Sequence, residues 1–488
     1  MVSASFLNQN SNVAAQFFRV AAESPDHLAV IAEPEVLNFE DFAVFVRKVA
    51  AALRAKGVGQ GSVVCVDTDD FLVAIPSLLA TSMLGAAWMA QATHAVSSEF
   101  VTPTHFFSSR AATLAANRRY QPISRDWGMQ GGDIDTAQAG FPGYTDPEAP
   151  WIFSHTSGTT GNPKLITFSQ RISFDRSMAV GDDFVSRRTV FASLFDCNAR
   201  PYVTRVLASL HNGCTIVYSE KTQLWEMAGV NFVYGSTAQL QRAFADVVLS
   251  RKISVVHVTG SKHTDRLTHQ LLKSFEQVVD LYAASETNRS FKNVQTVDGN
   301  GNMVTIGQPV DSKVEIVDEA GNPCKPDEVG TVRVQSPYMI KGYYRDLEAT
   351  ARAFRDGWFY PGDFGYWGAR GQLVVMGRLG DVINSGGIKV NALEIDETLQ
   401  EVDGIVDAMC FEYSSEQDGT SEIVAFVKYA PGADGTAVSL LAKAACLTKL
   451  NPFRTPARFV EVETIPRAHD GGAQRFLCES LYRELKSL

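Results

Sequence analysis

The chain has 488 residues, of which 45% are hydrophobic and 20% are charged, and its formal net charge is −10 at pH 7. This length exceeds what one hydrophobic core usually organises, so we expect at least two domains. The acidic balance argues against a general binder of nucleic acid or of a membrane surface. No stretch reaches the roughly 18 apolar residues of a membrane helix, and the N-terminal residues lack the pattern of a secretion signal.

The 7 cysteines are scattered along the chain, and no two of them form a Cys-x-x-Cys pair. Their odd number and their spacing argue against both a disulfide framework and a structural zinc site. We therefore expect a protein of the reducing cytoplasm.

The first two thirds of the chain predict alternating helices and strands. Apolar residues recur at helical spacing from Asn12 and over 42–53, and a strand at 62–66 precedes a mainly apolar helix over 71–89. This alternation is typical of a layered α/β domain. Further elements are expected as follows: strands at 104–107, 151–153, 190–194, 215–218, 230–234, 255–258 and 278–282, and a helix over 203–210.

From about residue 313 the pattern changes. Segments 313–317 and 330–334 alternate apolar with polar residues, which predicts a pair of antiparallel strands, and 364–367 with 373–376 predicts a hairpin. The remainder mixes short helices and strands. These are helices over 392–400, over 437–447 and after 474, and strands at 408–412 and 423–429.

The whole pattern predicts an α/β protein of two domains. A large layered N-terminal domain, residues 1–379, includes a small β unit, and a smaller α+β C-terminal domain covers residues 380–488. We place the boundary directly after the second expected hairpin.

A loop of hydroxyl-bearing residues and glycines follows the expected strand at 151–153 and ends at Pro163-Lys164. Glycine lets backbone amides approach an anion, and the hydroxyls and the lysine ammonium offer further donors, so phosphate, in particular that of ATP, is the favoured ligand. A plain Ser/Thr/Gly linker stays an alternative. No Ser or Thr follows the lysine as in GxxxxGK[ST], which argues against a P-loop kinase or GTPase. The loop residues are Thr156, Ser157, Gly158, Thr159, Thr160 and Gly161.

At this loop the chain resembles the adenylate-forming superfamily: acyl-CoA synthetases, aryl-acid ligases, luciferases and the adenylation domains of nonribosomal peptide synthetases. The resemblance covers nearly the whole chain and depends on four motifs in the same order. It implies that ATP and Mg²⁺ convert a small carboxylic acid to an acyl-AMP with release of pyrophosphate. The acyl group then passes to the thiol of coenzyme A or of phosphopantetheine on a separate carrier protein. An amide-forming ligase with an amine acceptor is an alternative.

The second motif is the segment 282–286, YAASE, which resembles the YGxTE segment of the superfamily. The resemblance implies that Tyr282 lies beside adenine, that Ser285 touches the α-phosphate and that Glu286 holds Mg²⁺. Mg²⁺ favours a carboxylate together with phosphate oxygens, which agrees with that assignment. Ala283 replaces the usual glycine of the turn.

Two further segments resemble the remaining nucleotide contacts of the superfamily. The segment 357–363, GWFYPGD, matches GW(F/Y)xTGD, which implies that Asp363 binds the ribose hydroxyls. Arg378 would contact ribose or phosphate, and Gly260-Ser261 would border the adenine and the acyl pocket.

The segment 377–390, GRLGDVINSGGIKV, resembles the joint about which the smaller domain of the superfamily rotates between adenylation and thioester formation. The hinge position, usually Asp or Lys, is Gly380, and glycine keeps that rotation possible. Gly386, Gly387 and Lys389 would lie at the tunnel that admits the pantetheine arm.

The last motif departs from the superfamily. Residues 466–475, PRAHDGGAQR, match PRxxxGKxxR except that Gly472 stands where a lysine usually bridges the substrate carboxylate and the α-phosphate. Losing such a cation typically costs about 10²- to 10³-fold in rate. Three explanations stay open: removal of the lysine by engineering, its replacement by Lys486, Arg475 or Lys389, or a protein that adenylates slowly or not at all. The last includes a non-catalytic nucleotide-binding homologue that serves as a partner or regulator.

Lys164, Glu286 and the position of Gly472 are therefore the expected catalytic positions. The acyl pocket is harder to predict. Asp196, in a Phe-Asp pair, resembles the aspartate with which amino-acid-activating relatives bind an ammonium group, and we also assign Tyr234 to this pocket. Arg200 and His211 are alternatives that suit a polar or anionic acyl group, and each of these side chains has a structural explanation as well.

Overall fold

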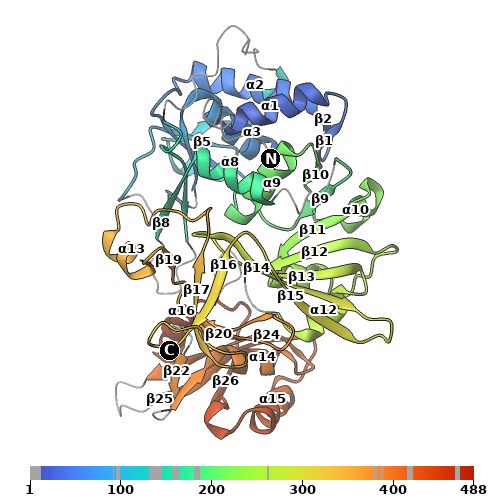
Figure 1. Cartoon of the computed structure of the whole chain (residues 1–488), viewed down its shortest axis with the longest axis vertical. Helices are drawn as coiled ribbons and strands as arrows, with labels where there is room; N and C mark the ends of the chain where they lie inside the picture. The colour runs from blue at the N-terminus through green and yellow to red at the C-terminus, as the bar shows by residue number, and fades with distance from the viewer. Residues whose placement is uncertain are drawn as a thin grey trace.

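The structure is a computed structural model, and it describes residues 12–91, 93–94, 99–130, 146–156, 164–180, 187–260, 263–378, 382–385, 388–414, 421–467 and 473–487. Sheets and helices alternate through the N-terminal part, and the C-terminal elements gather at the opposite end (Figure 1). The α/β class expected from the sequence is confirmed. Among the described residues, no helix combines the length and the apolar character needed to cross a membrane.

The first sheet has six strands in the order β6-β5-β3-β4-β7-β8. All neighbours are parallel except β7 and β8, which run antiparallel because a single loop joins them. The strands are β3 (Val63–Asp67), β4 (Ala87–Ala90), β5 (His105–Ser108), β6 (Gln121–Pro122), β7 (Pro150–His155) and β8 (Leu165–Ser169).

The second sheet has nine strands in the order β15-β14-β13-β12-β11-β9-β10-β1-β2. The six strands from β13 to β1 are parallel, so their carboxyl ends meet at one edge. The strands are β1 (Leu28–Ala32), β2 (Glu35–Asn38), β9 (Val190–Ser193), β10 (Thr215–Val217), β11 (Phe232–Ser236), β12 (Ile253–Thr259), β13 (Phe275–Ala284), β14 (Asn288–Val297) and β15 (Met303–Pro309).

Helices cover these two sheets, and one of them is buried on every side. All 14 residues of α3 (Phe71–Leu84) are buried, as expected for a helix that is apolar all round. The sequence predicted that this helix runs to residue 89, but it ends at Gly85, whose φ of 68° forms a left-handed cap, and β4 follows. The other described helices of this part are α1 (Val13–Glu23), α2 (Phe39–Ala55), α5 (Ala111–Ala116), α6 (Asp126–Gln130), α8 (Gln170–Ala179), α9 (Arg200–His211), α10 (Thr222–Ala228), α11 (Thr237–Ala243) and α12 (Asp265–Leu271).

A smaller β unit follows the second sheet. Its strands β16 and β17 pair antiparallel, and so do β20 and β21, as the alternating sequence predicted. The register places Asp363 opposite Arg378, so two residues expected at the nucleotide lie on neighbouring strands. The elements are β16 (Lys313–Val317), β17 (Gly330–Gln335), α13 (Leu347–Ala353), β18 (Phe354–Arg355), β19 (Trp358–Phe359), β20 (Asp363–Trp367) and β21 (Leu373–Arg378).

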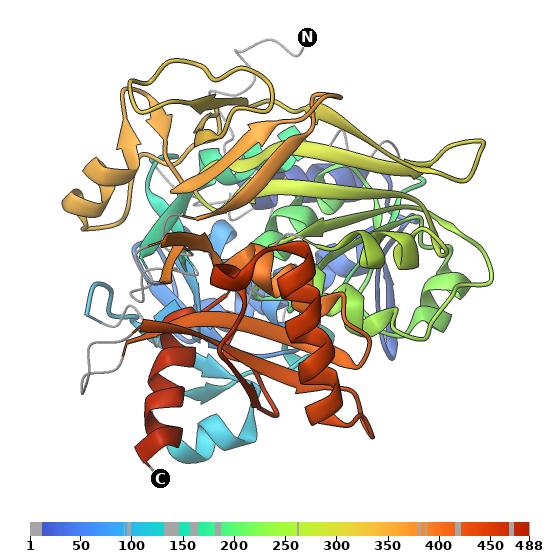
Figure 2. The same cartoon turned by 90° about the horizontal axis from the view of Figure 1, so that it is seen from below.

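The C-terminal elements build their own cores around a three-stranded sheet, β24-β25-β26. Seen from below, they lie in front of the N-terminal part (Figure 2). Arg475 and Asp396 form a buried ion pair of 2.7 Å within this unit. The elements are β22 (Val382–Ser385), β23 (Ile388–Asn391), α14 (Ala392–Gln400), β24 (Ile405–Ser414), β25 (Ser421–Tyr429), α15 (Gly435–Lys449), a 3-10 helix (Pro452–Arg454), β26 (Arg458–Glu461) and α16 (Arg475–Ser487).

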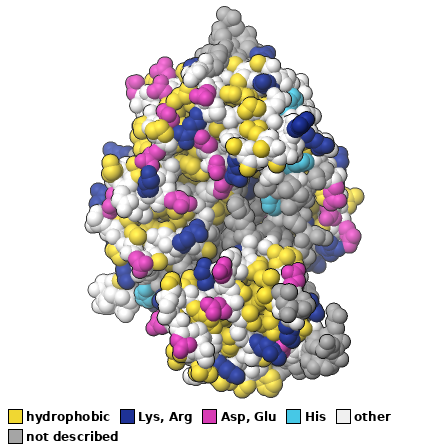
Figure 3. All heavy atoms as spheres, turned by 180° about the vertical axis from the view of Figure 1, so that it is seen from behind, with side chains coloured by type: hydrophobic (Ala, Val, Ile, Leu, Met, Phe, Trp, Pro, Cys, Tyr) yellow, Lys and Arg dark blue, Asp and Glu magenta, His cyan; other side chains and the backbone are white. Residues whose placement is uncertain are grey.

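The surface carries mixed charge. On the face shown in Figure 3, Lys and Arg side chains are interspersed with Asp and Glu over the described residues. Neither sign of charge therefore dominates that face, although the formal net charge of the whole chain is −10.

The buried helix α3 gives a test of the fold. Leu79 on this helix is 0% exposed, so Leu79→Ala should lower the free energy of unfolding by about 2–5 kcal/mol. Leu441→Ala on α15, where the leucine is 59% exposed, should change it by less than about 0.5 kcal/mol. Urea denaturation followed by circular dichroism measures both, and equal shifts in the two midpoints would contradict the placement of α3.

Candidate active site

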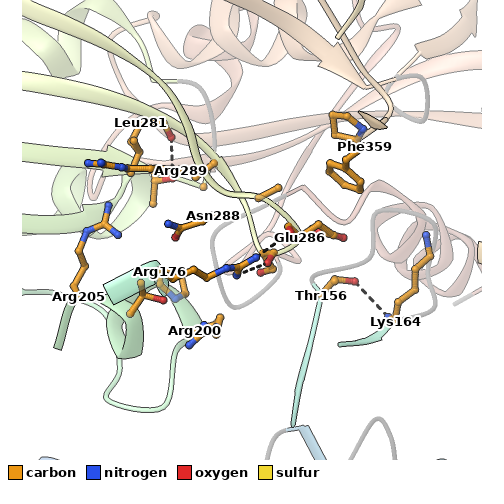
Figure 4. A pocket seen from close by; sticks show the side chains of 18 of the residues that line it. Thr156, Lys164, Arg176, Arg200, Arg205, Leu281, Glu286, Asn288, Arg289 and Phe359 are labelled. Carbon is orange, nitrogen blue, oxygen red and sulfur yellow. Dashed lines mark hydrogen bonds between the residues drawn. The ribbon is translucent and has the colours of Figure 1, made fainter. Parts of the chain in front are cut away.

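A pocket lies at the edge where the parallel strands of the second sheet end. Thr259 and Gly260 from the end of β12 line it, together with Tyr234 of β11 and the turn after β13 (Figure 4). Residues from the ends of the glycine-rich loop and from the small β unit complete the lining of the pocket. In open α/β sheets, ligands bind outside the carboxyl ends of the strands, so this position is suited to a substrate site.

Both described ends of the glycine-rich loop reach the pocket. The amide of Thr156 donates to the Lys164 carbonyl at 2.9 Å, and the Lys164 amide donates to Thr156 Oγ1 at 3.3 Å. Lys164 Nζ lies 4.7 Å from the centre of the Tyr343 ring. These bonds fix where the loop leaves and rejoins the sheet. The rest of the predicted loop, Ser157, Gly158, Thr159, Thr160 and Gly161, lies outside the described residues.

Glu286 faces the same pocket from the turn after β13. Its side chain is 8% exposed, and Oε1 accepts a hydrogen bond of 2.8 Å from the Tyr343 hydroxyl. Tyr343 thus contacts both Lys164 and Glu286, and Figure 4 shows Glu286 between the arginines and the pair of Thr156 and Lys164.

This donor set fits Mg²⁺ that arrives with a nucleotide. The described residues contain no group of three or more His, Cys, Asp or Glu that could hold a metal. Mg²⁺ is commonly bound through one or two carboxylates and the substrate phosphates, and Glu286 offers one carboxylate in the pocket that Thr156 also lines.

The turn that carries Glu286 is held by a buried guanidinium. Arg176 of α8 is 2% exposed; Nη1 donates to the Ser285 carbonyl at 2.8 Å and Nη2 to the Glu286 carbonyl at 2.9 Å. Nε donates to the Tyr338 carbonyl at 3.0 Å. Burial lowers the pKa of Arg176, neighbouring Arg200 lowers it further, and Glu286 opposes both. Arg176 therefore positions the backbone on which Ser285 and Glu286 stand.

The predicted ribose and adenine residues come together. The Tyr282 hydroxyl donates to Asp363 Oδ2, although the two residues are 81 positions apart. Asp363 is 6% exposed and lies opposite Arg378 in the β20–β21 register. The side chain of Arg378 is outside the described part of the chain.

Gly260 and Ala283 line the pocket at the ends of their strands. The φ of Gly260 is +98°, a value that favours glycine, so a side chain there would strain the turn. Ser261 is not among the described residues.

The two residues assigned to the acyl pocket lie in different places. Tyr234 lines it, with its ring 4.8 Å from the Arg205 guanidinium. Asp196 is not among the described residues of the lining; its Oδ1 accepts hydrogen bonds from the amide and side chain of Asn198, at 2.8 and 3.0 Å. These bonds form a turn before α9, and the role of Asp196 toward a substrate stays a prediction.

Of the two alternatives, Arg200 lines the pocket and His211 is held elsewhere. His211 is 3% exposed between Ser177 Oγ at 2.8 Å and the Val13 carbonyl at 3.0 Å. Burial lowers the pKa of His211 to about 4, so the ring is neutral at pH 7.

The remaining predicted positions follow residue 379 in the sequence. Gly380, Gly386, Gly387 and Gly472 lie outside the described residues, as does the side chain of Lys389. Arg475 is paired with Asp396 and donates to the Cys410 carbonyl at 2.5 Å. Lys486 Nζ lies 4.5 Å from the centre of the Tyr413 ring.

Sequence reasoning missed Arg176 and Tyr343. Both act through contacts with residues at least 57 positions away, and neither lies in a recognisable motif. Nothing in the local sequence separates them from structural residues.

The class of the protein follows from comparison with known proteins. A family model described as AMP-binding enzyme matches residues 17–344, and the chain belongs to this family. The predicted membership of the adenylate-forming superfamily is confirmed, and so is the predicted class of enzyme, an acid–thiol ligase that forms acyl-adenylates.

Individual relatives are distant but match over most of their length. The chain is 25% identical over 505 residues to a probable CoA ligase, CCL9, of Humulus lupulus. The alignment covers 94% of this chain and 94% of that protein. The chain is 26% identical over 468 residues to a 2-succinylbenzoate–CoA ligase of Geobacillus kaustophilus, with 92% of each covered. The O-succinylbenzoate coenzyme A synthetase of Bacillus subtilis, solved with ATP and magnesium ion, shares the fold with a TM-score of 0.78, 19% identity and coverage of 94% and 98%.

Replacing the guanidinium that holds the Glu286 turn should weaken both fold and site. Lysine cannot reach the carbonyls of residues 285, 286 and 338 together, so Arg176→Lys should lower the free energy of unfolding by about 2–4 kcal/mol. AMP binding should weaken as well, because the turn lines the pocket. Urea denaturation and calorimetry with AMP measure these effects, and Arg242→Lys on the exposed face of α11 is the control. Wild-type stability in Arg176→Lys would show that the turn does not depend on this side chain.

Proposed function

We propose that this chain activates a small carboxylic acid with ATP as an acyl-AMP, releases pyrophosphate, and passes the acyl group to a thiol. The observation that carries the proposal is the meeting of Thr156, Lys164 and Glu286 in one pocket of an AMP-binding enzyme. Ammonium and hydroxyl donors suit phosphate oxygens, and a carboxylate suits the metal ion that accompanies them. The ATP and magnesium ion in the B. subtilis synthetase support the same pair of ligands.

In the first half-reaction, a carboxylate oxygen of the acid attacks the α-phosphorus, and the bond to pyrophosphate breaks. Lys164 and the loop that begins at Thr156 would hold phosphate oxygens, and Asp363 would accept hydrogen bonds from the ribose hydroxyls. Glu286 would hold Mg²⁺, which neutralises phosphate charge when it is bound. Tyr343 keeps the Glu286 carboxylate in place through its 2.8 Å hydrogen bond.

In the second half-reaction, a thiolate attacks the acyl carbon and AMP leaves. Coenzyme A is the acceptor that the names of the CoA ligase relatives support, and phosphopantetheine on a carrier protein has the same thiol chemistry. We assign residues 1–379 and 380–488 to two domains, with a hinge near Gly380 and the pantetheine arm entering beside Gly386 and Gly387. A rotation of the smaller domain would then switch the active site from acyl-AMP formation to thioester formation.

The competing proposal is that the protein binds a nucleotide but does not catalyse a reaction. Gly472 favours it, because a preorganised cation at that position would otherwise stabilise the transition state. Calorimetry with ATP and with an acyl-sulfamoyl adenosine tests it, since a degenerate site should bind neither compound tightly.

The carboxylate at residue 286 gives a direct test of the proposed reaction. Glu286→Gln should reduce acid-dependent pyrophosphate release by about 10²- to 10³-fold, because the metal ligand is lost. Tyr343→Phe keeps the carboxylate and removes one hydrogen bond, so its effect should be about tenfold. A coupled pyrophosphate assay over a broad panel of carboxylic acids measures both. Background rates for every acid, even with lysine introduced at position 472, would contradict the enzymatic function.

The departure at position 472 gives a second test. Gly472→Lys should raise the rate of acyl-AMP formation and leave the transfer from preformed acyl-AMP nearly unchanged, because the cation acts in one transition state only. Gly472→Met, similar in length but uncharged, is the matched control. Single-turnover assays of each half-reaction separate the effects. Equal gains for Met and Lys would show that ordering of the backbone, and not charge, is responsible, and no gain for either would mean that another cation already acts.

A further inference from the structure

The pocket is strongly positive at the end far from the phosphate loop. Its described lining holds five cationic side chains and one carboxylate, Glu286. The cations are Lys164, Arg176, Arg200, Arg205 and Arg289. Figure 4 shows Arg200 and Arg205 on the opposite side of Glu286 from Lys164, so the two ends of the pocket carry separate groups of positive charge.

Two of these arginines form hydrogen bonds or ion pairs within the protein. Arg176 donates to three backbone carbonyls, and Arg289 forms an ion pair of 2.8 Å with Asp311. Arg200 and Arg205 line the pocket together with Tyr234 and Phe195 and add two further positive charges there.

Arg200 has donors that the folded chain does not use. Its Nε and Nη1 are buried and have no hydrogen-bond partner within the described part of the chain. The guanidinium lies 3.8 Å from the centre of the Phe168 ring, which holds it in place, and burial lowers the pKa of Arg200 to about 9. Arg200 is also the first residue of α9, where the helix dipole disfavours a cation. An anion in contact with this group would satisfy the donors and offset both costs.

A second unused donor comes from a different element. Asn288 begins β14, is 8% exposed and lines the pocket, and its Nδ2 finds no hydrogen-bond partner among the described residues. Its φ of 68° lies in the left-handed region, which asparagine and glycine adopt more readily than other residues. Nδ2 and the guanidinium of Arg200 are donors only, so the group that complements them is an acceptor.

Arg205 adds charge to the same end. It is 3% exposed, and its guanidinium lies 4.8 Å from the centre of the Tyr234 ring. A buried cation at the same end as the three unused donor atoms of Arg200 and Asn288 gives a site that is complementary to an anion in charge and in hydrogen bonding.

We propose that the acid carries a second anionic group, a carboxylate in the simplest case, which accepts hydrogen bonds from Arg200 and Asn288 near the charge of Arg205. This inference rests on the proposed function, because it assigns the opposite end of the same pocket to the carboxylate that is activated. Only that carboxylate reacts with ATP, and the second anion stays unchanged and orients the acid.

Binding is measured first, so that the test does not depend on catalysis. Calorimetry uses the full chain, with and without α,β-methylene-ATP and Mg²⁺, and a series of dicarboxylic acids from malonate to suberate. Each diacid is compared with the monoacid of the same number of carbons. At least one diacid should bind at least tenfold more tightly than its monoacid partner. Sulfonate analogues such as 3-sulfopropanoate distinguish a general anion site from one that requires the geometry of a carboxylate.

Variants then assign the effect to the two donors. Arg200→Met should weaken binding of the preferred diacid by about 10- to 100-fold and change binding of the monoacid by less than about threefold. Asn288→Gly, which tolerates the positive φ, should weaken diacid binding by about fivefold. Arg242→Met on α11 removes an exposed arginine and should change neither.

The pyrophosphate assay with the same acids separates this inference from the proposed function. Pyrophosphate release with diacids, reduced in kcat/KM by Arg200→Met, supports both. Release with monoacids and diacids at equal kcat/KM overturns the inference and leaves the proposed function in place. Tight diacid binding that depends on Arg200 but without pyrophosphate release overturns the function and keeps the anion site. The wild-type comparison of diacid and monoacid decides the inference even if a variant does not fold.

Discussion

The buried guanidinium of Arg176 connects the two halves of the site. It lies on α8, which follows the strand β8 that the glycine-rich loop enters, and it donates to the backbone of the turn after β13. The loop belongs to the first sheet and the turn to the second, so the distance between Lys164 and Glu286 depends on how these sheets are joined. Removing a buried charge from its carbonyl partners is costly, and the geometry is therefore fixed strongly.

The pocket has two regions of different chemistry, one on each side of Glu286. On one side Tyr343 contacts both Lys164 and Glu286, which suits phosphate oxygens and their metal ion. On the other side Arg200 and Asn288 offer donors in a setting of buried aromatic rings. A molecule with an activated carboxylate at one end and an anion at the other would use both regions at once.

Much of this arrangement could be predicted from the sequence, because the relevant signals are local. The YAASE segment and the Gly-Asp turn predicted Tyr282 and Asp363 as neighbours of one nucleotide, and the hydrogen bond between them agrees with that placement. The alternating segments predicted the antiparallel pairs of the small β unit. Helix α3 was predicted in position but not in length, since its apolar run continues into β4 and only the left-handed Gly85 separates the two.

The remaining features could not be predicted, because they depend on contacts between distant segments. Arg176 reaches carbonyls more than 100 positions away, and nothing in the sequence of α8 distinguishes it from Arg171 on the same helix. The role of Asp196 toward an ammonium group stays a prediction, and the described hydrogen bonds of its side chain come from Asn198 in the turn before α9. From the sequence, Arg200 could be either a structural residue or a residue that binds the acyl group. Its place in the pocket and its unused donors favour binding of an anionic substrate.

The central claim is that a carboxylate oxygen of the acid attacks the α-phosphorus of ATP, and isotope transfer tests it most directly. The acid that reacts fastest is labelled with ¹⁸O in both oxygens of the reacting carboxyl group and is turned over with ATP and coenzyme A. Mass spectrometry of the AMP should then find one ¹⁸O atom per molecule, since the bridging oxygen leaves with the nucleotide when the thiol attacks. AMP without the label, or a label found in inorganic phosphate together with ADP as the nucleotide product, would contradict the account.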